Sequence, residues 1–200
     1  MDSSYKFDRS TGYPPHVEDW SLIDSQLSQR GRFLEVGVAE GRSVVTTAEL
    51  LFSPSTEMYC VDSWERPEEG EMNFDHNLSI LQQKYSNKIT KKKIKSIDAF
   101  IEFMHTNTKF DFIYIDSEKS GKSVIQDFVL SFHLLNVDGI LMFDDYYAER
   151  EQDPIENSKM ALNMVMFQYQ KYITVLRKGK RCIIKKRKHE LRQVKYEQSH

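Results

Sequence analysis

The stretch FLEVGVAEGRS, residues 33–43, decides the fold, because it joins an apolar strand, a glycine turn and a helix start within eleven residues. The strand takes its apolar side chains from Phe33, Leu34, Val36 and Val38. Gly37 and Gly41 allow positive φ or a close approach of the backbone to a ligand, and Ser43 is expected to cap the helix that runs to Leu51. A nucleotide cofactor fits beyond the carboxyl end of such a strand, against free backbone N–H groups.

The spacing of the glycines argues against a dinucleotide cofactor. The dinucleotide fingerprint has glycines at i, i+2 and i+5, and centring it on Gly37 puts Glu35 and Glu40 at the outer positions. A nicotinamide dehydrogenase is therefore the weakest alternative. The pattern that remains, E-x-G-x-x-x-G, resembles motif I of the class I S-adenosylmethionine-dependent methyltransferases.

A second apolar run, residues 58–62, ends in Asp62, which lies 21 residues after Gly41. An acid at this place accepts hydrogen bonds from the ribose hydroxyls of an adenosine, so Asp62 is predicted to hold the ribose. The alternative is a strand-end cap or turn former. Trp64 is predicted to cover the adenine face, with simple packing as its alternative.

Two further apolar runs, residues 110–116 and 139–145, also end in carboxylates, which are Asp116, Asp144 and Asp145. Parallel neighbouring strands bring such ends to the same edge of the sheet as Gly37 and Asp62. The sequence therefore predicts one cleft that several acid-tipped strands face.

With these strands the chain resembles a family of small single-domain methyltransferases related to the sugar and catechol O-methyltransferases. The likeness covers most of the chain and is carried by the segments FLEVGVAEGRS, YCVDSW, FDFIYID, LLNVDGILMFDDY and VLRKGKRCIIKK. It implies S-adenosylmethionine (SAM) as cofactor and a hydroxyl of a small molecule or sugar as methyl acceptor. The cofactor contacts that it implies come from Glu35, Gly37, Gly41, Ser43, Asp62, Trp64, Asp116 and the strand end Ser96, Ile97 and Asp98.

The resemblance also implies a metal site. In the metal-dependent branch a divalent ion lowers the pKa of the acceptor hydroxyl, and three carboxylate or amide oxygens hold the ion. Asp116, Asp144 and Asp145 match those positions, and oxygen ligands suit Mg²⁺. The alternative is that Asp116 shapes a turn and only one of the paired aspartates faces the cleft, because adjacent strand residues point to opposite sides.

Lys119 marks a departure from the family pattern. After the strand-ending aspartate the most similar members commonly carry Gly-Ser-His, whereas this chain has Ser117, Glu118 and Lys119. An Asp-x-x-Lys pattern occurs in the catechol branch, where the lysine acts as the base. The resemblance therefore implies Lys119 as a catalytic residue beside Asp116, and a solvated loop lysine is the alternative.

Alternation of apolar runs and amphipathic segments predicts an α/β fold. The expected architecture is a Rossmann-like, doubly wound, mostly parallel seven-stranded sheet with helices on both faces and an antiparallel C-terminal hairpin. Strands are predicted near residues 33–38, 57–62, 89–95, 110–116, 139–145, 172–177 and 181–185. Helices are predicted near residues 16–29, 43–51, 75–86, 98–105, 120–135 and 157–170.

The predicted organisation is one methyltransferase domain over residues 31–187, preceded by a segment and helix (1–30) that can act as a lid. A basic tail, 188–200, follows it. Mobile loops are expected at Pro14–Pro15 and over residues 65–73, where they can flank the cleft.

Composition sets further limits. The 200 residues are 40% hydrophobic, which suits one domain, and no apolar run approaches the ~20 residues of a membrane span. With no signal-peptide core, the chain is expected in the cytoplasm, so Cys60 and Cys182, both in apolar runs, are expected to be buried thiols. The oligomeric state stays open, with a homodimer among the alternatives.

Charge is distributed unevenly along the chain. Residues from Arg177 onward carry a net +8 and the rest a net −10. This pattern leaves an RNA methyltransferase as one alternative function, although a solvated tail is the simpler interpretation and nucleic acid is not the expected partner. A binding protein that holds SAM without turnover is the second alternative, because the family histidine is absent.

Overall fold

The computed structural model describes residues 4–8, 17–65, 68–86, 88–146, 153 and 156–188. The strands are β1 (Arg32–Val36), β2 (Glu57–Asp62), β3 (Ile89–Lys93), β4 (Phe110–Ile115), β5 (Leu135–Phe143), β6 (Ile173–Lys178) and β7 (Cys182–Lys186). The helices are α1 (Val17–Gln26), α2 (Arg42–Leu51), α3 (Glu68–Tyr85), α4 (Ser96–His105), α5 (Gly121–Leu134) and α6 (Ser158–Gln168).

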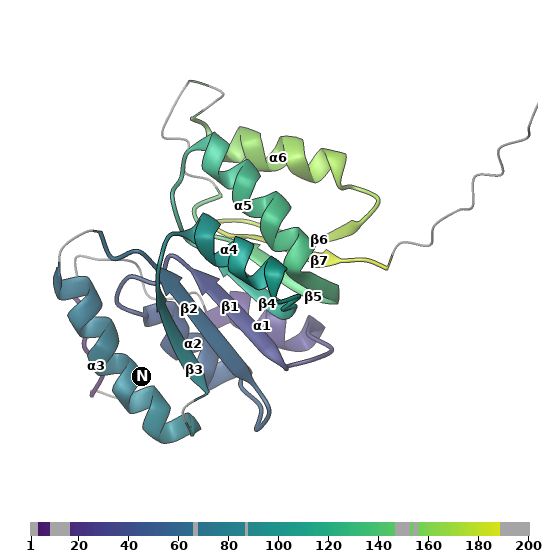
Figure 1. The fold of residues 1–200 in the computed structure, drawn as a ribbon. Helices are drawn as coiled ribbons and strands as arrows, with labels where there is room; N and C mark the ends of the chain where they lie inside the picture. The colour runs from purple at the N-terminus through teal and green to yellow at the C-terminus, as the bar shows by residue number, and fades with distance from the viewer. Residues whose placement is uncertain are drawn as a thin grey trace, which may run out of the picture.

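All strands of the described chain belong to one seven-stranded sheet, in the order β3-β2-β1-β4-β5-β7-β6 (Figure 1). The first five strands pair in parallel, and β7 pairs antiparallel with both β5 and β6. The predicted Rossmann-like sheet with a C-terminal antiparallel hairpin is therefore confirmed. The chain runs from β1 outward to β3 and returns to β4, so β1 and β4 flank the switch point at which such sheets bind ligands.

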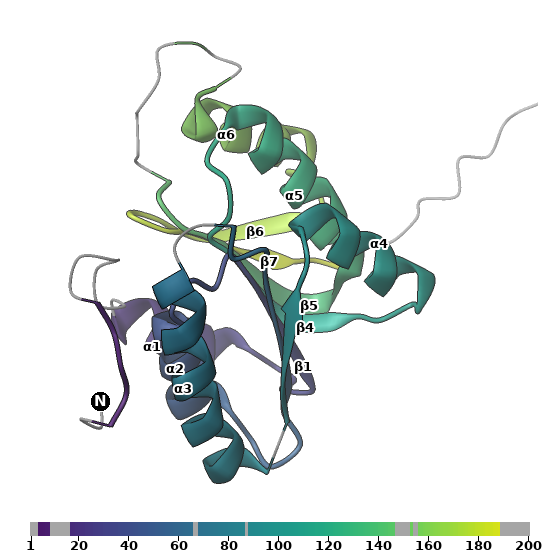
Figure 2. The same cartoon turned by 60° about the vertical axis from the view of Figure 1, so that its left-hand side comes forward.

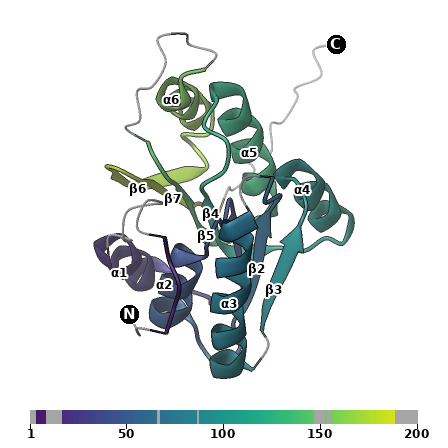
Figure 3. The ribbon, with the colours of Figure 1, turned by 90° about the vertical axis from the view of Figure 1, so that its left-hand side faces the viewer.

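Helices cover both faces of the sheet. Figures 2 and 3 show α1, α2 and α3 on one face, with α4, α5 and α6 on the other. Every residue of β4 is buried, with Phe112 and Tyr114 in the core under α1–α3 and Ile113 and Ile115 in the core under α4–α6. Coverage on both faces explains why this strand is a continuous apolar run and not an alternating one.

Helix α1 is part of the core. The fully buried Trp20 packs edge-on against Tyr114, with ring centroids 5.9 Å apart, and its indole nitrogen donates to the hydroxyl of Thr47 at 2.9 Å. Within the described residues, no helix combines the length and apolar character that crossing a membrane requires. Cys60 and Cys182 are buried free thiols, as predicted.

Some expected boundaries were wrong. The mobile loop expected over residues 65–73 is largely the start of α3, which begins at Glu68. Two ion pairs hold this part of the helix against β3, since the carboxylate of Glu71 lies 2.7 Å from the Lys91 ammonium and 2.6 Å from that of Lys93. Sequence periodicity did not reveal these contacts because they join different elements, with 20 and 22 residues between the partners' positions in the sequence.

The strand end expected at Ser96, Ile97 and Asp98 is instead the first turn of α4. Strand β5 ends at Phe143, so Asp144 and Asp145 follow the strand and do not lie within it. The backbone has turned at Asp145, whose φ is 54°. Pro14–Pro15, the predicted helix start at His16 and the basic tail from residue 189 onward lie outside the described residues.

The turn after β1 touches the turn after β4 with no room for a side chain. A Cβ atom at Gly37 would lie 2.2 Å from the backbone oxygen of Asp116, and φ at Gly37 is +84°. Both observations require glycine at this position.

We expect Gly37→Ala to lower the free energy of unfolding by about 2–5 kcal/mol, because alanine disfavours positive φ and its methyl group would push the two turns apart. Denaturant unfolding measures this loss. Gly70→Ala in α3 is the matched control, since nothing lies within 4 Å of a Cβ there. Its expected effect is neutral or stabilising by about 0.5–1 kcal/mol. Equal unfolding curves for the two variants would contradict the argument.

Candidate functional site

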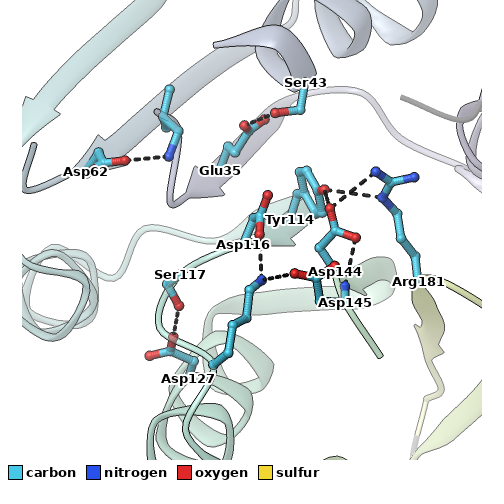
Figure 4. Close-up of polar contacts among 12 residues, drawn as sticks. Glu35, Ser43, Asp62, Tyr114, Asp116, Ser117, Asp127, Asp144, Asp145 and Arg181 are labelled. Carbon is cyan, nitrogen blue, oxygen red and sulfur yellow. Dashed lines mark hydrogen bonds and ion pairs between the residues drawn. The ribbon is translucent and has the colours of Figure 1, made fainter. Parts of the chain in front are cut away.

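The carboxylate of Asp62 fixes the glycine turn. Its Oδ2 accepts hydrogen bonds from the backbone N–H groups of Val38 at 2.8 Å and Ala39 at 2.9 Å, and its Oδ1 accepts from that of Trp64 at 2.8 Å. Figure 4 shows Asp62 reaching the backbone of the glycine turn. Asp62 therefore has the turn-forming role that was its alternative. Each carboxylate oxygen has two lone pairs, so Oδ1 retains one for a further donor, and the ribose contact stays a prediction.

Trp64 packs against the same turn. Its indole nitrogen donates to the carbonyl oxygen of Ala39 at 2.9 Å, and its ring stacks on Phe74 with centroids 5.2 Å apart. The Lys91 ammonium lies 4.8 Å from the centre of the indole ring. These contacts leave 8% of Trp64 exposed. Packing thus accounts for the side chain, and the adenine contact stays a prediction.

Glu35 of β1 is a fully buried acid beside the glycine turn. The sequence suggested that Ser43 caps α2, but Ser43 does not do so. The helix begins one residue earlier, after Gly41, and the hydroxyl of Ser43 donates to Oε1 of Glu35. Oε2 of Glu35 is buried without a hydrogen-bond partner in the described structure. Burial raises the pKa of Glu35 well above its usual value, with the hydrogen bond from Ser43 opposing the rise.

Asp116, Lys119 and Asp145 meet at the ends of β4 and β5. The ammonium nitrogen of Lys119 lies 2.5 Å from Oδ1 of Asp116 and 4.0 Å from Oδ2 of Asp145 (Figure 4). Although 35% of the Asp116 side chain is exposed, its depth beneath the surrounding chain raises its pKa to about 6, against the opposing charge of Lys119.

Asp144 points away from this group, toward the buried guanidinium of Arg181. Its Oδ2 accepts from the hydroxyl of Tyr114 at 2.5 Å and from Arg181 at 3.2 Å, while its Oδ1 accepts from the backbone N–H of Asp145 at 2.7 Å. Arg181 also contacts Asp19 of α1 at 3.1 Å. Burial of Asp144 opposes its ionisation, but Arg181 and Tyr114 outweigh burial and lower its pKa.

The three predicted metal ligands therefore do not converge. In the described part of the chain no three His, Cys, Asp or Glu side chains form a group that can hold a metal ion. Two of the three face Lys119 and the third faces Arg181. Sequence reasoning missed Arg181, Tyr114 and Asp19, because their partners lie at least 30 residues away in the chain and no local pattern signals such a contact.

A shallow recess opens to solvent beside these groups, between the ends of β4 and β5 and helices α5 and α6. Its lining combines apolar side chains with Lys119 and Asp144, and includes Ile115, Val124, Tyr146 and Leu162. Such a mixture of apolar walls and a few polar groups suits a small organic molecule.

Beneath the recess, Asp127 of α5 is buried and accepts a hydrogen bond from the hydroxyl of Ser117 at 2.5 Å. Burial raises its pKa from 3.8 to about 6, with the Ser117 bond opposing the rise. The folded state therefore binds a proton at Asp127 more tightly than the unfolded chain does, so this group's contribution to stability is lost as the pH rises through that range.

We expect Asp127→Asn to become more stable relative to the wild type as the pH increases. The amide keeps an acceptor for Ser117 and never ionises. Between pH 4 and pH 7 the difference in unfolding free energy should grow by up to about 3 kcal/mol, as urea denaturation at both pH values would measure. An equal difference at the two pH values would contradict the assignment.

Comparison with protein families gives a match over the central part of the chain. A family model described as a methyltransferase domain matches residues 34–146. The match spans the glycine turn, Asp62, Asp116, Lys119 and the pair after β5. A search of curated protein sequences found no match.

Solved structures share the fold at low identity. The O-methyltransferase from Bacillus cereus in complex with S-adenosylhomocysteine (SAH) is 15% identical, with 87% of this chain and 82% of that chain covered and a TM-score of 0.64. TomG from Streptomyces achromogenes, an O-methyltransferase of tomaymycin synthesis in complex with SAM, is 15% identical, with coverage of 87% and 81% and a TM-score of 0.67. MycE in complex with Mg, SAH and mycinamycin VI is 15% identical, with coverage of 86% and 49% and a TM-score of 0.64.

Proposed function

This chain belongs to the family of methyltransferase domains, and we propose that it uses SAM to methylate a hydroxyl group of a small molecule or sugar. The observation that carries this proposal is the buried, unpartnered Oε2 of Glu35 beside the glycine turn. A buried acid without a partner is costly unless a ligand supplies a donor or a positive charge. The ammonium group of SAM provides both.

The residues around the switch point fit the rest of the cofactor. Asp62 retains one lone pair for a ribose hydroxyl, and the first turn of α4 presents the free backbone N–H groups of Ser96, Ile97 and Asp98. Gly37 and Gly41 keep the turn clear of side chains. When bound, SAM supplies an electrophilic methyl group, so that an O–CH₃ bond forms while the S–CH₃ bond breaks and sulfur keeps that electron pair.

The chain's own residues orient the acceptor and accept its proton. Asp116 lies at the end of β4 next to Gly37, between the cofactor turn and the recess, and its carboxylate takes the proton from the acceptor hydroxyl. The Lys119 ammonium donates a hydrogen bond to the oxygen of the acceptor hydroxyl. It can do so because its bond to Asp116 uses only one of its three N–H groups. Positioning of the oxygen by these two groups supplies much of the rate acceleration.

The described part of the basic C-terminal region lends little support to an RNA substrate. Arg177 and Arg181 pair with Asp19, at 2.6 Å and 3.1 Å. The ammonium of Lys185 donates to the carbonyl oxygen of Gln26, and that of Lys186 donates to main-chain carbonyls around the α5–β5 junction. These four basic residues therefore stabilise the fold. A strong salt dependence of substrate binding would instead favour the RNA alternative.

We expect SAH to bind and to stabilise the protein, by about 2.7 kcal/mol at 100 times its dissociation constant. Glu35→Gln should weaken SAH binding at least about tenfold, because the amide loses the negative charge that favours an ammonium group. Titration calorimetry measures both.

The matched control is Glu57→Gln, since Glu57 begins β2 at the opposite edge of the sheet and pairs with Arg32 in an exposed position. It should leave SAH affinity unchanged. A wild-type protein that does not bind SAH would overturn the proposal, and equal affinities of the Glu35 variant and the wild type would remove Glu35 from it.

A further inference from the structure

The ammonium group of Lys119 lies where an ion shared by two carboxylates would have to lie. Asp116 and Asp145 approach it from the loops after β4 and β5, with their nearest oxygens 2.5 Å and 4.0 Å from the nitrogen. A divalent ion that both carboxylates ligate must occupy the space between them. Lys119 follows Asp116 by three residues on the same loop, and its side chain fills that space.

Asp144 is already hydrogen-bonded to other groups of the chain. Both of its oxygens accept hydrogen bonds, and its charge is matched by Arg181, which is 4% exposed. Turning Asp144 toward a metal would break these bonds and leave part of the buried guanidinium without its partner, which costs several kcal/mol in comparable cases. Among the described residues, Asp116 and Asp145 thus face Lys119 while Asp144 faces Arg181, and this arrangement does not fit a metal ion.

We infer that Lys119 replaces the divalent ion at the acceptor end of this site, so that the chain acts without a metal. Asp116 and Asp145 would bind a metal ion if the Lys119 side chain were removed. This inference deepens the proposed function and rests on it for the identity of the acceptor. An ammonium group offers the acceptor oxygen a positive charge, as an ion would, and it donates a hydrogen bond where the ion would form a coordination bond. The acceptor proton passes to Asp116.

The test is direct binding of Mn²⁺, which like Mg²⁺ prefers oxygen ligands, to the full-length chain in the presence of SAH. Electron paramagnetic resonance measures the bound fraction. We expect Lys119→Ala to bind Mn²⁺ at least about tenfold more tightly than the wild type, because removal of the ammonium leaves Asp116 and Asp145 facing each other. Lys119→Arg retains a cation and should bind no more tightly than the wild type.

Lys122→Ala is the matched control, since Lys122 is exposed on the first turn of α5 and lies outside the site. It should bind Mn²⁺ as the wild type does. Tight Mn²⁺ binding by the wild type, or no gain in Lys119→Ala that still binds SAH, would overturn the inference. Loss of SAH binding by the wild type itself would overturn the proposed function instead, so the two failures are distinguishable.

Discussion

The contact on which the site depends is between two stretches of backbone. Gly37 and the carbonyl group of Asp116 are so close that no side chain fits between the turn after β1 and the turn after β4. The N–H of Asp116 also donates to the carbonyl oxygen of Val36 at 2.8 Å. Because of this contact, Glu35 of β1 and the pair of Asp116 and Lys119 after β4 lie on either side of the place where the two turns touch. In the proposed function, the backbone and not flexible side chains thus sets the distance between the methyl donor and the acceptor oxygen.

The two ends of the site differ in how their charges are balanced. At the acceptor end each carboxylate has a cation from the chain itself, Lys119 for Asp116 and Arg181 for Asp144. At the proposed cofactor end, Glu35 has a hydroxyl donor but no contacting cation among the described residues, and burial dominates its pKa. Such an arrangement favours a positively charged ligand at one end and a neutral hydroxyl compound at the other.

Sequence reasoning captured the parts of the structure that local patterns encode. The apolar runs of β1 and β4, the glycines of the turn and the Lys-Gly-Lys hairpin each specify their own conformation, so the sheet and its C-terminal hairpin were predicted correctly. Interactions between distant residues were not accessible in this way. The bond from Ser43 to Glu35 replaced an expected helix cap, and the ion pair of Asp144 with Arg181 redirected an expected metal ligand. In each case burial near a tertiary partner decided which way the side chain points.

The link from Asp19 through Arg181 to Asp144 joins the first described helix to the last strand. During synthesis the N-terminal part of a chain emerges first, and its local contacts form before the rest is made. The glycine turn and Asp62 lie in the first third of the sequence, whereas Arg181 is among the last residues of the fold to appear. Asp144 therefore lacks this partner until the start of β7 has been made, and a chain released before that point would carry the glycine turn without the ion pair that orients Asp144.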